Sequence, residues 1–492
     1  MERAPIDFSM SDFGGKRMNV SLNAEQIGDA LNRSVKLAMD SGEAATSEAA
    51  RRIFEGYRLS IIAGPDVASS ATKQAALLTA VNTGRRCFLG GVEVACRTDA
   101  ELLIPWRNCR TIAEAVRDLQ GALTHSNAEG LPQIIIGDVG ERGKKSEFAV
   151  RATFDGWRGG VVPIDDGRQL DEQNEFTPAG VMAGAIAVSE AFQYVRGRNA
   201  KAGRRAVGLS LWRPDASTSW FDGREAGVNP ECLPARLWLI GLGHLGQAYL
   251  WTLGFLPYQN PGDVQIVLQD YDTLVVANDS TSLLTDCRLI WQRKTRAMAE
   301  WCEQRGFRTR INERRFASNF RIDEEEPQVA LCGVDNEAAR AALEEVGFGQ
   351  IIEAGLGRTN EEYLAFQMHC FPASRSARKR WGVDMSAQGG PTLLDRPAYQ
   401  SLASEGMERC GLTMLANRAV GASFVGAFTS ALIVAELLRM AMGERRYEVI
   451  DGTLRSLDDR QAFASEGLSA PFNPGVTEPL QNVGSLNRRL VA

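Results

Sequence analysis

The sequence has few histidines, no paired cysteines and no long uninterrupted apolar run. It contains three histidines and nine cysteines, and the cysteines form no CxxC pair and no evenly spaced framework. Structural zinc sites are built from clustered cysteine and histidine ligands, so the sequence predicts no zinc site. Scattered, unpaired cysteines in a long chain indicate reduced thiols, which favours a cytoplasmic location.

The sequence also lacks a membrane-spanning or signal segment and an excess of positive charge, which argues against a membrane protein and a nucleic-acid-binding protein. No apolar run reaches the roughly 18 residues of a membrane span, and the first residues lack the apolar core of a signal peptide, so we expect a soluble protein without a membrane partner. The formal net charge is −6. Nucleic-acid surfaces depend on lysine and arginine for most of their affinity, so we expect no nucleic-acid partner.

The length of 492 residues predicts two or more domains. Apolar strand patterns alternate with helical patterns through most of the chain, which predicts α/β domains with mostly parallel sheets. The stretch "WRPDASTSWFDGREAGVNPECLP" contains the turn-forming residues of a linker. The predicted division is an irregular N-terminal arm (1–40), a first α/β domain (41–212), a linker (213–234), a second α/β domain (235–460) and a C-terminal tail (461–492).

The two α/β halves resemble diverged copies of one architecture. Residues 177–195 and 417–437 are both long apolar helices rich in small residues, and each comes late in its half. A helix class shared without duplication is the alternative. In the first half, "RRCFLGGVEV" (85–94) reads as a strand.

The turn "GLGHLG" of the second half has the GxGxxG spacing, with glycines at 241, 243 and 246 between a predicted strand and a predicted helix. Such a turn lets backbone N–H groups and the helix N-terminus hold a phosphate. Tight packing of strand on helix without a nucleotide is the alternative. The next strand, however, ends in Asp270, whose carboxylate can accept the hydroxyls of a ribose.

Further polar groups follow at later strand ends and helix starts. Asp272 comes two residues after Asp270. Lys294 lies on a predicted helix that begins in the polar "QRKTR" turn, where its ammonium could reach a phosphate or lie solvated on the helix face. Asp335 ends another strand, where it could bind Mg²⁺ or cap the following helix.

In this order the residues resemble the ThiF/MoeB superfamily, which includes the ubiquitin-activating (E1-like) enzymes. The resemblance covers about residues 235–455 and rests on a spaced set: "GLGHLG", Asp270 with Asp272, Asn278, Lys294, Asp335–Asn336 with Arg340, "EAGLG" at 353–357, and Cys410 before a glycine-rich apolar helix.

The resemblance implies two tandem Rossmann-like domains of the ThiF type and an ATP- and Mg²⁺-dependent adenylyltransferase. The C-terminal carboxylate of a ubiquitin-like protein would be adenylated, and Cys410 would then take the acyl group as a thioester for a conjugating enzyme or another acceptor. Gly241, Gly243 and Gly246 would pack on the nucleotide. By the same resemblance, Asp270 would bind the ribose, Lys294 would neutralise phosphate charge, and Asp335 would hold Mg²⁺.

Asp272 and Asn278 would support the same pocket. A buried structural role is the alternative for Cys410, and Cys370 in "HCFP" is the second candidate thiol.

The sequence departs from the family pattern in the first half and in the segment after Asn278. The first half has "AGPDVASS" in place of the glycine turn and lacks the later acidic positions, so it resembles a degenerate adenylation domain paired with an active second half. The arginine expected three residues after Asn278 is replaced by Thr281. Arg288, Arg293 and Arg33 are the candidate replacements. An NAD(P)-dependent oxidoreductase and a non-catalytic E1-like scaffold are the alternative functions, and conjugation is favoured over sulfur transfer.

Overall fold

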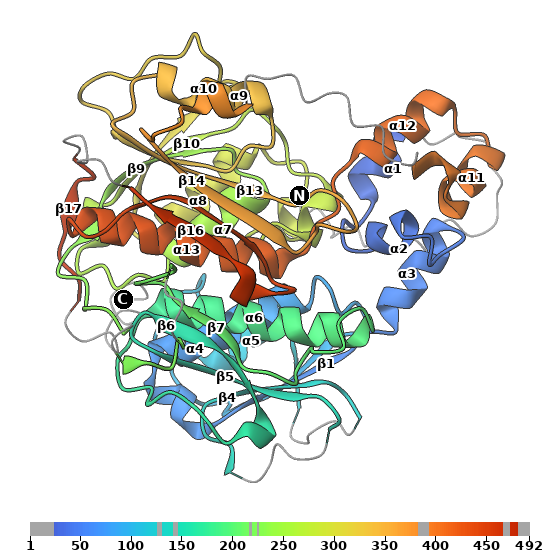
Figure 1. Ribbon diagram of the computed structural model, residues 1–492, viewed down its shortest axis with the longest axis horizontal. Helices are drawn as coiled ribbons and strands as arrows, with labels where there is room; N and C mark the ends of the chain where they lie inside the picture. The colour runs from blue at the N-terminus through green and yellow to red at the C-terminus, as the bar shows by residue number, and fades with distance from the viewer. Residues whose placement is uncertain are drawn as a thin grey trace, which may run out of the picture.

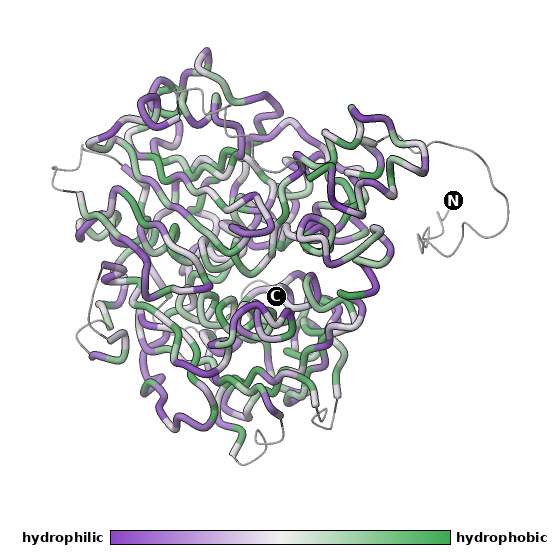
Figure 2. The backbone as a smooth tube through the Cα atoms, turned by 45° about the vertical axis from the view of Figure 1, so that its right-hand side comes forward, coloured by the Kyte–Doolittle hydropathy of each residue, from purple (hydrophilic) through white to green (hydrophobic). Residues whose placement is uncertain are grey.

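The protein is described from a computed structural model, which covers residues 24–124, 130–140, 146–215, 219–223, 226–381, 393–465 and 473–480. It contains two large α/β halves, one above the other in Figure 1, and a small helical lobe at their side. Hydrophobic segments run through the interior of both halves, whereas hydrophilic segments are frequent along the outer loops (Figure 2).

The first half is built on a seven-stranded sheet with the order β3-β2-β1-β4-β5-β6-β7. Its strands are β1 (Leu59–Ala63), β2 (Val92–Ala95), β3 (Ala122–Leu123), β4 (Gln133–Ile136), β5 (Ala149–Asp155), β6 (Arg158–Pro163) and β7 (Val207–Ser210). The expected strand at 85–94 is wrong at its start, because Arg85 and Arg86 directly follow helix α4 (Ala71–Gly84) and β2 begins only at Val92.

The second half is built on an eight-stranded sheet with the order β11-β10-β9-β12-β13-β14-β15-β16. Its strands are β9 (Arg236–Ile240), β10 (Gln265–Gln269), β11 (Arg308–Asn312), β12 (Val329–Cys332), β13 (Gln350–Leu356), β14 (Ala365–Phe371), β15 (Tyr447–Thr453) and β16 (Gln461–Ala464). A separate pair, β8 (Leu233–Pro234) and β17 (Val476–Thr477), joins the linker to the C-terminal tail.

The two sheets repeat one topology. In each, the first five strands along the chain are parallel to one another, and the sixth and seventh are added antiparallel. In the second sheet β16 adds one more antiparallel strand. Four buried helices lie between the sheets: α4, α6 (Thr177–Val195), α7 (His244–Leu253) and α13 (Ser423–Ala441) (Figure 1). The predicted α/β fold with two tandem domains of one architecture is confirmed.

Residue-level correspondences between α6 and α13 support duplication over a merely shared helix class. Glu190 and Glu436 are each the fourteenth residue of a 19-residue helix. Each carboxylate accepts a backbone N–H from the strand or turn that follows, from Gly203 at 2.8 Å and from Tyr447 at 3.0 Å.

The fourth residue is a glycine in both helices. An added Cβ would lie 2.2 Å from the Thr72 carbonyl oxygen at Gly180, and 2.3 Å from His244 Nε2 at Gly426.

By length and composition alone, α13 is one helix that could cross a membrane, but 94% of its apolar window is buried inside the protein. It is therefore a core helix, packed against α6 and α7. Its apolar character reflects burial on all sides.

The small lobe combines two distant chain segments. Helices α1 (Ala24–Ala30), α2 (Lys36–Asp40) and α3 (Ser47–Glu55) precede the first sheet, and they pack with α11 (Pro397–Ser404) and α12 (Arg409–Asn417) of the second half. A buried ion pair between Lys36 and Asp40 (2.6 Å), with the Tyr399 hydroxyl donating to Asp40 at 2.6 Å, ties the segments together.

The N-terminal arm, expected to be irregular, is therefore helical in its described part. The remaining helices are α5 (Ile112–Asp118), α8 (Lys294–Glu303), α9 (Glu337–Ala341) and α10 (Ala377–Trp381).

Candidate functional site

A cavity of about 590 Å³ opens at the carboxyl ends of β9, β10 and β12. In an open α/β sheet this edge is the usual place for a ligand. The predicted site residues meet there: Gly241, Gly243, Asp270, Asp272, Asn278, Lys294 and Asp335 all line the cavity. Gly246 lies in α7, where an added Cβ would lie 1.9 Å from the Gly241 carbonyl oxygen, so this glycine closes the turn.

The glycine turn presents backbone to the cavity. Gly241 has a φ of +84°, and Gly243 is the residue before the first turn of α7. A Cβ added at Gly243 would meet nothing within 4 Å, which shows that this position faces open space. The free N–H groups at the start of α7 can therefore hold an anion in the cavity.

The two carboxylates at the end of β10 lie next to a lysine. Lys294 Nζ lies 2.8 Å from Asp272 Oδ2 and 3.8 Å from Asp270 Oδ2. Asp270 also accepts the backbone N–H of Leu242 at 2.7 Å and that of Asp272 at 2.8 Å, which joins β10 to the glycine turn. The lysine is thus part of the cavity wall and does not lie on a solvated helix face.

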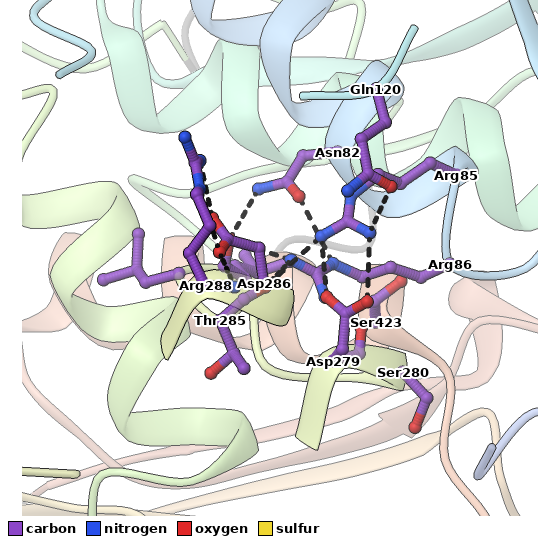
Figure 3. A network of polar contacts seen from close by, with 12 residues as sticks. Asn82, Arg85, Arg86, Gln120, Asp279, Ser280, Thr285, Asp286, Arg288 and Ser423 are labelled. Carbon is purple, nitrogen blue, oxygen red and sulfur yellow. Dashed lines mark hydrogen bonds and ion pairs between the residues drawn. The ribbon is translucent and has the colours of Figure 1, made fainter. Parts of the chain in front are cut away.

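Asn278 supports the wall through its side chain. Its Oδ1 accepts the backbone N–H of Val275 at 2.8 Å, which shapes the turn that follows β10. The next residue, Asp279, faces the first half of the chain, where Arg85 and Arg86 bind its carboxylate (Figure 3). Burial raises the pKa of Asp279, but the two arginines outweigh this effect, and the pKa is lowered.

Asp335 is exposed in the cavity and does not cap a helix. The cap of α9 is Asn336, whose Oδ1 accepts the backbone N–H of Ala339 at 2.9 Å. Among the residues that the structure describes, no three His, Cys, Asp or Glu side chains come close enough to hold a metal ion. A magnesium ion often takes one protein carboxylate together with phosphates and water, and Asp335 fits that role.

The Arg340 side chain binds acceptors within the protein. Its Nε lies 2.9 Å from Glu353 Oε1 and donates to the Val334 carbonyl at 2.9 Å. The Glu353 carboxylate is fully buried and also contacts His369 Nδ1 at 2.9 Å. Arg340 therefore fixes the loop that carries Asp335 next to the cavity.

Of the three candidate replacements for the missing arginine, only Arg33 lines the cavity. Its Nη1 is buried without a hydrogen-bond partner. Burial, and next the charge of Arg418, lower the pKa of Arg33 to about 10, so its guanidinium is charged at neutral pH. Arg288 is paired with Asp286 and Asp118, and Arg293 donates to the Tyr271 carbonyl.

Four further arginines in the cavity wall had no sequence signal that singled them out: Arg314, Arg315, Arg358 and Arg418. Arg314 and Arg315 follow β11, the third parallel strand, and this position at the carboxyl edge of the sheet is the one feature that could have indicated them.

Cys410 lies outside this cavity. It is exposed near the start of α12, and it lines a shallow, open neighbouring cavity with Thr413, Met414, Asn417 and Arg418. Asn417 and Arg418 line both cavities. Because α12 rises about 1.5 Å per residue, Cys410 is about 10 Å along the helix from Asn417. Cys370 is buried in β14.

The corresponding strand ends of the first half are closed by ion pairs. After β1, the Asp66 carboxylate accepts the backbone N–H of Asp138 at 2.8 Å and pairs with Lys73 at 2.5 Å. Lys73 also pairs with Glu172 at 2.9 Å. An added Cβ at Gly64 would lie 2.3 Å from the Asp138 carbonyl oxygen, so the loops after β1 and β4 are in direct contact.

Comparisons with known proteins identify the family. Two family profiles match the chain: the BilD N-terminal domain over residues 58–211 and the BilD C-terminal domain over residues 233–444. A relative from Collimonas sp. (strain OK412), named "Bacterial E1-like protein BilD", is 42% identical over 429 residues, which is 87% of this chain and 92% of the relative. The chain belongs to the BilD family. The predicted E1-like resemblance is thus confirmed at the level of the family, through a BilD relative that is itself described as E1-like.

Each BilD domain match falls within one half of the fold, and the C-terminal match ends before β15 and β16. The N-terminal match spans β1 to β7, and the C-terminal match spans β8 to α13. Arg33 precedes the first match.

Among solved structures, the E. coli tRNA N6-threonylcarbamoyladenosine dehydratase TcdA is 14% identical, with a TM-score of 0.28 over 42% of this chain and 86% of TcdA. The protein PaaA is 11% identical, with a TM-score of 0.30 over 47% of this chain and 72% of PaaA.

Proposed function

We propose that this BilD family member activates the C-terminal carboxylate of a ubiquitin-like protein by adenylation with ATP. The observation that carries the proposal is one cavity that contains a glycine turn, a ribose-type acid, Lys294, Asp335 and Arg33, whose Nη1 is buried without a hydrogen-bond partner. A plain dinucleotide site needs the first two features, whereas the last three suit a triphosphate.

In the proposed reaction, a carboxylate oxygen of the protein substrate attacks the α-phosphorus of ATP. The bond from the α-phosphorus to the bridging oxygen breaks, pyrophosphate leaves, and an acyl-adenylate remains. The Asp270 carboxylate accepts hydrogen bonds from the ribose, and the backbone of Gly241 and Gly243 holds phosphate oxygens. Lys294 and Arg33 neutralise the charge that moves onto the leaving group.

Magnesium would be held by Asp335, and when bound it neutralises phosphate charge and orients the triphosphate. The protein contribution to this step is the position of the Asp335 loop, which the Arg340–Glu353 pair fixes through the Val334 carbonyl.

Cys410 is proposed as the acceptor of the activated acyl group. Its thiolate would attack the acyl carbonyl, AMP would leave, and a thioester would pass to a conjugating enzyme or another acceptor. Cys410 is exposed near the start of α12, so its sulfur is accessible to an acyl-adenylate and to a conjugating enzyme. The cavity of Cys410 shares Asn417 and Arg418 with the nucleotide cavity, which supports a short path between the two steps.

The first half is proposed as an inactive partner domain. Its strand ends are bridged by Asp66, Lys73 and Glu172 at the positions where the second half leaves a cavity open. The repeated topology then reproduces, within one chain, the packing of two related domains of which one binds ATP.

The test is ATP–pyrophosphate exchange by the purified full chain with each small, glycine-tailed protein encoded beside it. We expect exchange with one such protein, dependent on its intact C-terminus and on Mg²⁺. The Asp335→Ala variant should lose exchange, whereas Glu345→Ala should retain it, because the Glu345 carboxylate pairs with Arg378 on the surface and does not line the cavity. Exchange with no such protein, together with no binding of ATP, would leave a non-catalytic scaffold as the function.

A further inference from the structure

The segment 278–285, which follows β10, is held by the first half of the chain. Arg86 Nη1 lies 2.8 Å from Asp279 Oδ1 and donates also to the Asp279 carbonyl, while Arg86 Nη2 donates to the carbonyls of Leu283 (3.1 Å) and Thr285 (3.0 Å). Arg85 Nη2 binds the same carboxylate at 2.8 Å. One guanidinium thus fixes both ends of the segment (Figure 3).

Arg86 is itself rigidly placed. Its side chain is 1% exposed, and its Nε donates to Asn82 Oδ1 at 3.2 Å. Asn82 donates in turn to the Leu283 carbonyl at 2.9 Å, so two residues of the first half contact the same turn. Burial of an arginine costs free energy unless its N–H donors have acceptors. The acceptors that surround the Arg86 guanidinium therefore hold it in one defined position.

The same segment reaches the nucleotide cavity on its other side. Asn278 and Thr281 line that cavity. Ser280, between them, accepts the backbone N–H of Arg33 at 3.0 Å, and the Arg33 carbonyl accepts the backbone N–H of Gly421 at 3.4 Å. The Arg33 backbone is therefore placed by Ser280 on one side and Gly421 on the other.

We propose that Arg86 is a positioning residue for triphosphate binding: it holds segment 278–285, and Ser280 of that segment holds Arg33 in the cavity. The inference rests on the proposed function, since it gives the Arg33 guanidinium a triphosphate as its partner. It assigns to the inactive first half a direct part in the active site, although no atom of Arg86 lines the cavity.

The test measures binding of Mg·ATP and of AMP to the full chain by calorimetry. Loss of one hydrogen-bonded support should weaken ATP binding by about threefold to tenfold in Arg86→Lys and in Ser280→Ala. AMP lacks the β- and γ-phosphates, so its affinity should change by less than about twofold. In an Arg33→Ala background, neither substitution should weaken ATP binding further, because the supports act through Arg33.

Two matched controls separate positioning from general damage. Ser282→Ala removes a buried hydroxyl of the same segment that has no hydrogen-bond partner. Arg305→Lys changes another buried arginine that joins the halves, by donating to the Pro105 carbonyl at 2.6 Å, and that does not line the cavity. Both controls should bind ATP and AMP as the unaltered chain does.

Equal weakening of ATP and AMP, or effects that add to that of Arg33→Ala, would show a structural role and overturn the inference. If Arg86→Lys does not fold, Ser280→Ala alone decides it, since that change leaves the ion pairs of Asp279 with Arg85 and Arg86 in place. If the unaltered chain binds neither ATP nor AMP, the proposed function itself is overturned. This result differs from one in which the unaltered chain binds both ligands and the variants bind them equally well, which overturns only the inference about Arg86.

Discussion

Lys294 Nζ lies 2.8 Å from Asp272 and 3.8 Å from Asp270, so one ammonium is shared by the two carboxylates at the end of β10. A phosphate that enters the cavity would compete with Asp272 for this ammonium. The Asp272 side chain is 47% exposed, against 8% for Asp270, so Asp272 is the partner that water can replace. Asp270 stays bound to the glycine turn and remains available to a ribose.

Replacement of Lys294 by alanine should lower the rate of ATP–pyrophosphate exchange by about 100-fold, because one preorganised charge on the phosphates is lost. The matched control is Arg296→Ala, on the same helix, where the arginine pairs with Glu313 on the surface. Equal rates for both variants would contradict a phosphate contact by Lys294.

Replacement of Arg33 by alanine should weaken Mg·ATP binding by at least about tenfold and leave AMP binding within about twofold, because a guanidinium facing the β- and γ-phosphates is removed. Arg288→Ala and Arg293→Ala remove the two other candidates, which bind protein acceptors and do not line the cavity. A loss of ATP binding in either of those variants would show that the missing arginine is supplied from there.

Replacement of Cys410 by alanine should abolish a thioester that reductant cleaves while leaving ATP–pyrophosphate exchange unchanged, because Cys410 lies outside the nucleotide cavity. The protein substrate and its C-terminal mass should be followed by non-reducing electrophoresis and mass spectrometry. Cys287→Ala removes the other exposed cysteine and should retain the thioester. Persistence of the thioester in Cys410→Ala would assign the acceptor to another residue.

Because of the Asp279 ion pairs, the free energy of unfolding should decrease as the pH falls into the acid range. Arg86 and Arg85 lower its pKa despite burial, so the carboxylate stabilises the folded chain above its unfolded pKa of about 4, and this stabilisation is lost as pH falls through the lower folded value. Asp279→Asn should cost about 1–3 kcal/mol at pH 7. The difference from the unaltered chain should shrink towards pH 2, and urea unfolding at both pH values measures it.

The strand ends of the second half could be predicted from sequence because their signals are local. Gly241, Gly243 and Asp270 lie within one strand-turn-helix-strand unit, so spacing alone brings them together. The parallel order of the sheet then places Asp335 at the same edge.

The partners of Asp279 could not be predicted in this way, because Arg86 is 193 residues away and follows a helix of the other half. The pair "RR" was instead assigned to a strand, since an apolar run follows it. Helix α12 was also missed. Cys410 was expected just before the apolar helix, but it lies on a separate exposed helix that packs on α1.

The repetition of one topology within a single chain has a consequence for how such a protein can change. In an assembly of two identical subunits, every substitution occurs on both sides of the interface. Here the gene encodes the two copies separately, so Arg85 and Arg86 can follow α4 while α7 keeps a glycine turn at its start. If the first half is the inactive partner proposed above, fusion allows a division of labour, in which one copy loses its own pocket and supports the pocket of the other.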